Sequence, residues 1–355
     1  MKNDKTENDI KGDKIVSGMT TAVTFLIIVL VMLFFIGIWI YLFGINNIII
    51  NKISGIIPYP AAIADNKIIS AYNLKKELDA VKTFYSNQDF SDAGLRVDFS
   101  TPDGQKRLKI KERRILTKLI ENALIEKEAN RRDIKLTDKE ISEEVDNKAQ
   151  QYGDNDFLKE NIKNLYDWNI DDFEKNIVKP DIYAKKLYEN IRLEDQDYVK
   201  AQAKIKQAKS ELENSKNFDS IVAKYSEGDS VKDRGDLGWY SINDMLPEIA
   251  QAITNLEKGK NSDIIESSIG YHIVRIEEKK TENDVEKFHI RQIFIRIPSF
   301  AQWLSKHEKE VRITIPLKGY VWDKNIGEVQ FTDPNMKAFE DNLQKNSADD
   351  ISVLF

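Results

Sequence analysis

The most hydrophobic stretch of the chain lies near its N-terminus. Charged residues are absent between Lys14 and Lys52, and residues 22–43 contain almost only apolar side chains. A helix of this length extends about 33 Å, which matches the bilayer core of roughly 30 Å. The pattern therefore predicts a transmembrane helix at residues 20–44, with the lipid bilayer as its partner.

Lysines are distributed unequally around this stretch. Four lysines precede it, whereas Lys52 is the only one among the next twenty residues. Because positive charges stay on the cytoplasmic side, residues 1–19 are predicted to form a cytoplasmic tail and the rest to lie outside the cytoplasm. An A-x-A sequence at 62–64 leaves cleavage of the anchor open as an alternative.

A helical pattern follows a short linker. Residues 45–65 are apolar but are interrupted by glycine and prolines, as in a linker. Apolar residues then recur at helical spacing, and Thr137 and Glu140 form a T-x-x-E capping box. A helix that begins near 171 must stop or kink near Pro180. These features predict an all-α domain at residues 66–194.

Strands join the helices in the next part of the chain. Two amphipathic helices precede a glycine-rich turn at 234–239, and a third helix is expected at 247–256. Runs of β-branched residues predict strands at 269–276 and 290–297. This order of elements predicts an α+β domain at residues 195–297.

The end of the chain, residues 298–355, is harder to interpret. Val311, Ile313 and Ile315 alternate as in a strand, and residues 336–343 fit a terminal helix. No motif in this segment assigns it a role. We expect it to pack on the preceding domain and to cover a sheet edge.

Composition and motifs exclude several classes of protein. The net charge is −6, with 53 Lys and Arg against 59 Asp and Glu, so no basic face for nucleic acid is expected. The sequence has no Cys and three His, so we predict no disulfide, no metal site and no cofactor. A membrane-bound hydrolase is disfavoured, because HExxH, GxSxG and P-loop motifs are absent.

The order and spacing of motifs between Phe218 and Ile276 resemble the parvulin family of peptidyl-prolyl isomerases. The matching pieces are FDSIVAKYSE, GDLGWYSINDMLPEIAQAI, L-x-K-G-K at 256–260, and GYHIVRIEE. The helical segment 113–141 resembles the N-terminal chaperone part of PrsA- and SurA-like foldases. The resemblance implies a membrane-anchored extracytoplasmic foldase. It would isomerise X-Pro bonds of unfolded or newly translocated polypeptides.

One strand of the parvulin pattern is out of place. The family begins with a strand of the type H-I-L-V, but the corresponding residues here, LEDQDYVK, are charged. A similar strand, RQIFIR, occurs instead at 291–296. The family's first and last strands are antiparallel neighbours. We therefore predict that 290–297 pairs antiparallel with 271–276, and that the domain is a circular permutant.

The resemblance also implies a set of site residues. Gln292 takes the position of the family's first-strand His, and His272 matches the other His. Strand alternation places His289 on the opposite face from Gln292. Because the preceding loop is one residue short, either Asp229 or Gly228 aligns with the family's polar position. The implied catalytic residues are His272, Gln292, Asp229 and Ser267, and the implied proline pocket is Leu237, Met245 and Ile249.

Each of these residues also has a purely structural interpretation. Met245 and Ile249 lie four residues apart, a spacing that is common for core residues, and a single strand His is often part of a core. Gln292 donates and accepts hydrogen bonds as a neutral His does, but it does not titrate. The alternative function is therefore a catalytically weak or inactive parvulin-like chaperone or peptide-binding scaffold.

Overall fold

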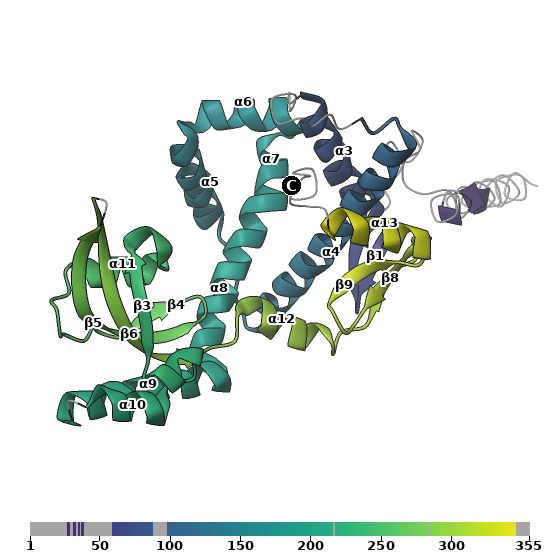
Figure 1. The fold of residues 1–355 in the computed structure, drawn as a ribbon. Coiled ribbons are helices and arrows are strands. Elements are labelled where there is room, and N and C mark those ends of the chain that lie inside the picture. The colour runs from purple at the N-terminus through teal and green to yellow at the C-terminus, as the bar shows by residue number, and fades with distance from the viewer. Residues whose placement is uncertain are drawn as a thin grey trace, which may run out of the picture. The chain divides into compact units, whose positions relative to one another are not determined.

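The computed structural model describes residues 59–87, 98–215, 217–282 and 284–345, and seven positions between 27 and 38 (Figure 1). The chain divides into two compact units. The first unit contains residues 1–127, 136–180 and 308–355, and the second contains residues 128–135 and 181–307.

Strands of the first unit come from both ends of the described chain. Its three-stranded antiparallel sheet has the order β2-β1-β7, and Ile63 pairs with Thr314. A separate antiparallel hairpin pairs β8 with β9. The bounds are β1 (Pro60–Ala64), β2 (Lys67–Ser70), β7 (Ile313–Thr314), β8 (Tyr320–Asp323) and β9 (Glu328–Phe331). This unit was expected to be all-α. It instead contains two local hairpins, β1 with β2 and β8 with β9, and the pairing of β1 with β7 joins residues far apart in sequence, which local periodicity does not reveal.

Helices make up the rest of the first unit. The predicted capping box is present, because the Thr137 side chain accepts from the Glu140 amide while the Glu140 carboxylate accepts from the Thr137 amide. The bounds are α3 (Ala71–Asn87), α4 (Pro102–Arg131), α5 (Asp138–Tyr152), α6 (Asn155–Tyr166) and α13 (Pro334–Lys345).

The helix before Pro180 widens instead of stopping. Three segments follow one another without a break: α7 (Ile170–Phe173), the π-helical η2 (Glu174–Val178) and α8 (Lys179–Glu194). Proline lacks an amide hydrogen, and its ring clashes with the carbonyl four residues earlier. A π-helical turn relieves this conflict by changing the local hydrogen-bond pattern. The sequence left open whether the helix stops or kinks near Pro180. The structure shows a local distortion within a continuous helix.

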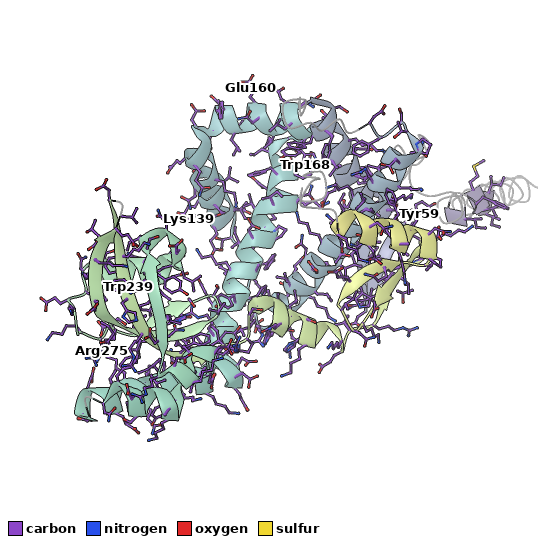
Figure 2. All side chains as sticks on the ribbon, viewed as in Figure 1. Tyr59, Lys139, Glu160, Trp168, Trp239 and Arg275 are labelled. Carbon is purple, nitrogen blue, oxygen red and sulfur yellow. The ribbon has the colours of Figure 1, made fainter. Side chains whose placement is uncertain are left out.

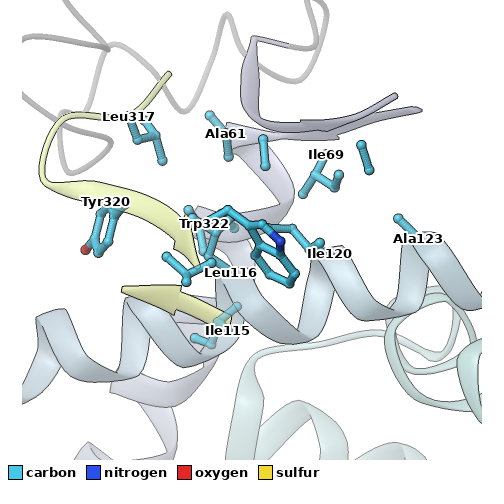
Figure 3. Packing of buried hydrophobic residues seen from close by; sticks show 14 of the residues in the cluster. Ala61, Ile69, Ile115, Leu116, Ile120, Ala123, Leu317, Tyr320 and Trp322 are labelled. Atoms are coloured by element: carbon cyan, nitrogen blue, oxygen red, sulfur yellow. The ribbon is translucent and has the colours of Figure 1, made fainter. Parts of the chain in front are cut away.

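The core of the first unit joins α4 to the late strands (Figure 3). Leu116 and Ile120 lie one turn apart on α4 and are fully buried. Figure 3 shows Trp322 of β8 beside these two residues, with Tyr320 on the same strand. Each of these three buried side chains stabilises the folded state by about 1.5–3 kcal/mol relative to an exposed one. The C-terminal segment therefore supplies part of the core of this unit.

A buried arginine makes polar contacts to the same segment. Arg113 of α4 donates from Nη2 to a Glu340 carboxylate oxygen at 2.7 Å and from Nη1 to the Val329 carbonyl at 2.6 Å. Thr117 accepts from the Val329 amide at 3.1 Å. Arg113 and Glu340 are both buried. These contacts fix β9 and α13 against α4.

We predict that Glu340→Ala destabilises the first unit by about 3–5 kcal/mol, because it leaves the Arg113 guanidinium buried without its main countercharge. Urea unfolding of the full chain measures this change. Asp341→Ala is the matched control, since Asp341 is the exposed neighbour on α13 and its replacement should change stability little. Equal effects of the two variants would contradict the prediction.

Glu77 of α3 is a buried carboxyl with an unusual titration. Its side chain is 7% exposed, and one carboxyl oxygen has no hydrogen-bond partner. Burial raises the pKa of Glu77 to about 7, although Lys118 and Lys175 act in the opposite direction. The folded state therefore keeps a proton that the unfolded state releases near pH 4.5.

This difference predicts that the first unit loses stability as pH rises from about 5 to about 8, since the folded state binds more protons in that range. Glu77→Gln should reduce this pH-dependent change in the free energy of unfolding by up to about 3 kcal/mol. Hydrogen exchange of α3 in urea measures it. Glu160→Gln, an exposed carboxyl on α6 labelled in Figure 2, should leave the dependence unchanged.

A four-stranded antiparallel sheet forms the centre of the second unit. The strand order is β3-β6-β5-β4. Figure 1 shows α9 and α10 side by side next to this sheet. The strands are β3 (Asp236–Ser241), β4 (Ile265–Ser267), β5 (Gly270–Glu282) and β6 (Val285–Arg296). The helical segments are α9 (Gln196–Ser215), α10 (Phe218–Tyr225), η3 (Asp229–Asp233), η4 (Ile242–Asp244), α11 (Pro247–Thr254) and α12 (Phe300–Glu308).

The two faces of this sheet have different partners. The guanidinium groups of Arg275 and Arg291 lie over the Phe218 ring of α10, at 5.9 and 4.9 Å from its centroid. On the other face, Val274 and Ile290 pack with Ile249 of α11. Alternation along β5 places His272 on the same face as Val274.

The predicted strand pairing is present. Tyr271 pairs with Ile295 and Ile276 pairs with Ile290, in antiparallel register. The same strand pairs on its other edge with β3, so β6 lies in the middle of the sheet. The circular permutation itself stays a prediction.

The predicted transmembrane helix requires a correction. Most of residues 20–44 and all of the expected tail 1–19 lie outside the described residues. Within the described residues, no helix is both long enough and apolar enough to cross a membrane, which stands against the predicted spanning helix. A spanning helix needs about 20 consecutive apolar residues, whereas the described helices carry apolar side chains mainly on one face. Residues 60–64 of the expected linker form β1.

Candidate active site

Three polar side chains form a hydrogen-bonded chain on the α11 face of the sheet. His272 lies in the middle, with Nδ1 at 3.1 Å from Oε1 of Gln292 and Nε2 at 2.8 Å from Oγ of Ser267. In the strand register Gln292 pairs with Val274, two residues along from His272. Diagonal neighbours on one face of paired strands are close enough for such contacts. The structure therefore brings together three of the four predicted catalytic residues.

The protonation of His272 follows from these neighbours. The side chain is 2% exposed, and burial lowers the pKa of His272 below its usual value of 6.5 despite the Gln292 hydrogen bond. The imidazole is therefore neutral at pH 7. With Gln292 Oε1 as acceptor, Nδ1 carries the hydrogen, and Nε2 accepts from the Ser267 hydroxyl.

A tight turn between β4 and β5 holds Ser267 in place. Its hydroxyl oxygen also accepts from the Ile269 amide at 3.3 Å and lies 3.2 Å from the Gly270 carbonyl oxygen. Gly270 has φ 159°, and a Cβ there would collide with the Ile295 carbonyl. Glycine is therefore needed where this turn meets β6, and the turn fixes Ser267 beside the imidazole.

The predicted proline-pocket residues lie on the same sheet face. Leu237 and Met245 are partly buried against the cluster that contains Ile249. Ile249 is 7% exposed, so most of its side chain belongs to the core. Leu237 and Met245 keep exposed surface, which a bound proline requires.

The fourth predicted catalytic residue is not joined to this chain of hydrogen bonds. Asp229 is exposed at the start of η3, and none of the described hydrogen bonds or ion pairs links it to His272. A Cβ at Gly228 would lie 3.3 Å from the Phe294 ring. The ring thus occupies the space beside Gly228. At neither of the two alternative positions does a polar group reach the imidazole.

Two contacts of the site were not predicted. The Phe294 ring lies 4.8 Å from the His272 ring, centroid to centroid, and covers it on one side. Alternation from Gln292 places Phe294 on the same strand face, so this signal was present in the sequence. The second is the charge of Glu248, which favours the protonated form of His272. No sequence pattern indicated it.

His289 belongs to a separate cluster, as its strand position predicted. Its Nε2 lies 2.8 Å from an Asp236 carboxylate oxygen, and its ring stacks on Trp239 of β3, which Figure 2 labels. Among the described residues, no group of three or more His, Asp or Glu side chains is arranged to hold a metal ion. The polar chain of Ser267, His272 and Gln292 and the apolar cluster beside it offer hydrogen bonds and apolar contact.

A buried polar chain beside an apolar cluster, on a four-stranded antiparallel sheet, is the arrangement that the resemblance to parvulins implies. Comparison with known families agrees: residues 186–278 match the PPIC-type PPIASE domain, and residues 14–193, half of the chain, match the SurA-like N-terminal domain. The chain belongs to the SurA-like N-terminal domain family and carries a PPIC-type peptidyl-prolyl isomerase domain. The predicted isomerase class is confirmed by these matches.

Individual relatives include foldases and chaperones. The chain is 26% identical to the foldase protein PrsA of Geobacillus sp. (strain WCH70), over 55% of this chain and 75% of that protein. It is 28% identical to the foldase protein PrsA of Caldanaerobacter subterraneus, over 58% of this chain and 66% of that protein. It is 34% identical to the chaperone SurA of Nitrosospira multiformis, over 26% of this chain and 21% of that protein. The isomerase match ends at residue 278, before β6, which supplies Gln292.

The lowered pKa of His272 predicts how acid affects the second unit. Below pH 6.5 the unfolded state takes up a proton that the buried imidazole does not, so stability falls as pH falls below 6.5. His272→Gln should lose this dependence, whereas His289→Gln should keep it. NMR titration of the imidazole checks the cause directly. A His272 midpoint at or above 6.5 would overturn the prediction.

Proposed function

We propose that this chain is an extracytoplasmic foldase that isomerises X-Pro bonds, with Ser267, His272 and Gln292 as the polar floor of the site. Leu237, Met245 and Ile249 form the adjoining proline pocket. The single observation that supports this assignment is the buried hydrogen-bonded chain next to a partly exposed apolar cluster. The PrsA and SurA relatives support a role on polypeptide substrates outside the cytoplasm.

The chemistry requires no bond to break. Rotation about the peptide bond has a barrier of about 18–20 kcal/mol because amide resonance resists twisting. A twisted amide loses this resonance, so a site that holds it in an apolar environment and offers hydrogen bonds lowers the barrier. Leu237 and Met245 supply the apolar surface for the proline ring. The neutral His272 chain supplies the polar contacts.

Gln292 leaves a second function open. A glutamine amide donates and accepts as a neutral imidazole does, but it is not a planar ring and does not titrate. Gly228, one of the two residues that align with the family's polar position, also has no side chain beside Phe294. These two features favour weak isomerisation with retained peptide binding, as in a peptide-binding chaperone. The two functions differ in rate, so kinetics separates them.

We predict that Gln292→His speeds isomerisation by about tenfold to a hundredfold, which corresponds to hydrogen-bond changes of roughly 1–3 kcal/mol. The measurement is a protease-coupled proline isomerisation assay on the full chain. Met245→Ala should weaken peptide binding, because it removes apolar surface from the pocket.

His289→Gln is the matched control for the first variant, since His289 lies outside the polar chain and should not affect the rate. A fast parent protein that Gln292→His leaves unchanged would show that the polar pair does not limit catalysis. Tight peptide binding without measurable isomerisation in the parent would instead favour the scaffold function.

A further inference from the structure

The first unit contains a pocket that is not part of the candidate active site. Its cavity volume is about 240 Å³, below the roughly 300–1,000 Å³ of pockets for drug-sized ligands. One wall is the face of α3 between Tyr72 and Thr83, and the other is the turn 166–168 that joins α6 to α7. All of these residues belong to the same unit. The pocket therefore has room for a ligand about the size of one ring.

The turn is held against α3 by polar contacts. Asp167 ends α6 in the left-handed conformation, with φ 55°. Just beyond the turn, Lys76 of α3 forms an ion pair with Asp172, and Lys175 donates to Oδ1 of Asn73 at 3.0 Å. The two walls are thus fixed relative to each other before a ligand binds, which lowers the entropic cost of binding.

Three aromatic residues line the pocket: Tyr72, Tyr166 and Trp168, the last of which is labelled in Figure 2. The Tyr166 ring stacks on Phe84, with centroids 5.5 Å apart and an interplanar angle of 7°. The Trp168 ring lies 5.6 Å from the Tyr166 ring, centroid to centroid. These contacts hold the rings in place, and an aromatic face offers an apolar surface to the C–H groups of a ligand.

The charges of the lining are balanced. Two lysines and two aspartates line the pocket, and each has an ionic partner. The pairs are Lys75 with Asp79, Lys76 with Asp172, and Asp167 with Lys163. A ligand with a net charge would meet about as much repulsion as attraction there. The lining therefore favours a neutral ligand.

The same walls are rich in hydrogen-bonding groups. Thr83 donates its hydroxyl to the Asp79 carbonyl at 3.0 Å, so its oxygen still has capacity to accept. Trp168 is 8% exposed, and its Nε1–H has no hydrogen-bond partner within the part of the chain that the structure describes. An apolar side chain in this pocket would remove water from these polar groups without replacing its hydrogen bonds. A hydroxylated ring replaces them, because each hydroxyl both donates and accepts.

We propose that this pocket binds a neutral pyranose sugar. The C–H face of the sugar lies on the aromatic wall, while its hydroxyls donate to Asp79 and Asp167 and accept from Lys75. A single sugar ring makes few contacts, so we expect a dissociation constant of about 1–10 mM for a monosaccharide. The site is independent of the isomerase domain, so the proposed function and this inference stand or fall separately.

The test titrates the full chain with methyl α-D-glucopyranoside, methyl α-D-mannopyranoside and N-acetylglucosamine. Indole resonances followed by NMR report the binding, and Trp168→Phe identifies the Trp168 signal by its loss. At least one of the three sugars should shift this signal in a saturable manner. Added salt should leave the dissociation constant unchanged, because attraction to a neutral ligand is not screened.

Two variants test the walls. Tyr72→Leu and Thr83→Val should each weaken sugar binding about threefold to tenfold, through loss of an aromatic face or of a hydrogen bond. Phe157→Leu and Ser86→Ala are the matched controls and should leave binding unchanged. Phe157 is an exposed aromatic residue of α6, and Ser86 is an exposed hydroxyl of α3 with the same kind of backbone hydrogen bond as Thr83. Neither lines the pocket. Thermal melts check that each variant is folded.

Several results would overturn the proposal. One is the absence of a saturable Trp168 shift with all three sugars. Another is a shift with N-acetylphenylalaninamide but with none of the sugars, which would identify a pocket for apolar side chains of polypeptides. Tighter binding of methyl β-D-glucuronide that weakens with salt would indicate a site for anions. Equal losses in the wall variants and in their controls would place the sugar elsewhere on the chain.

Discussion

Antiparallel pairing of β5 with β6 is the interaction on which the site depends. It places Gln292 diagonally across from His272, and it positions Phe294 over the imidazole. Because side chains alternate along a strand, a register shift of one residue would turn both groups to the α10 face. The polar chain that begins at Ser267 would then lack its second half. The backbone ladder thus controls the chemistry of the site, although the helices lie closer to its pocket.

Burial then determines how this polar chain behaves. A fully exposed His272 would titrate near neutral pH, but the sheet and α11 exclude water and keep it neutral. A neutral imidazole between Ser267 and Gln292 offers fixed hydrogen bonds and no charge. This suits a rotation in which no proton is transferred. The charge of Glu248 acts in the opposite direction to burial, because it favours the protonated ring.

Both units are completed by segments late in the chain. The first unit needs β7, β8, β9 and α13, which Arg113 and the core around Trp322 hold in place. The second needs β6 as the central strand of its sheet. Bringing together residues that are far apart in sequence costs chain entropy. Helices do not have this cost, because their contacts are local. Buried contacts must offset this cost, and Glu77 shows that the first unit also tolerates a carboxyl that destabilises it once ionised.

The sequence by itself determined the local elements, the parvulin-like order of motifs and the pairing of His272 with Gln292, because periodicity and strand alternation follow from backbone geometry. It did not determine where residues 298–355 pack, or that none of the described hydrogen bonds or ion pairs joins Asp229 to His272. The expected transmembrane helix has no counterpart among the described helices, none of which is long and apolar enough to cross a membrane. Only the tertiary structure decided these points, since long-range partners are chosen by burial, which one-dimensional patterns do not encode.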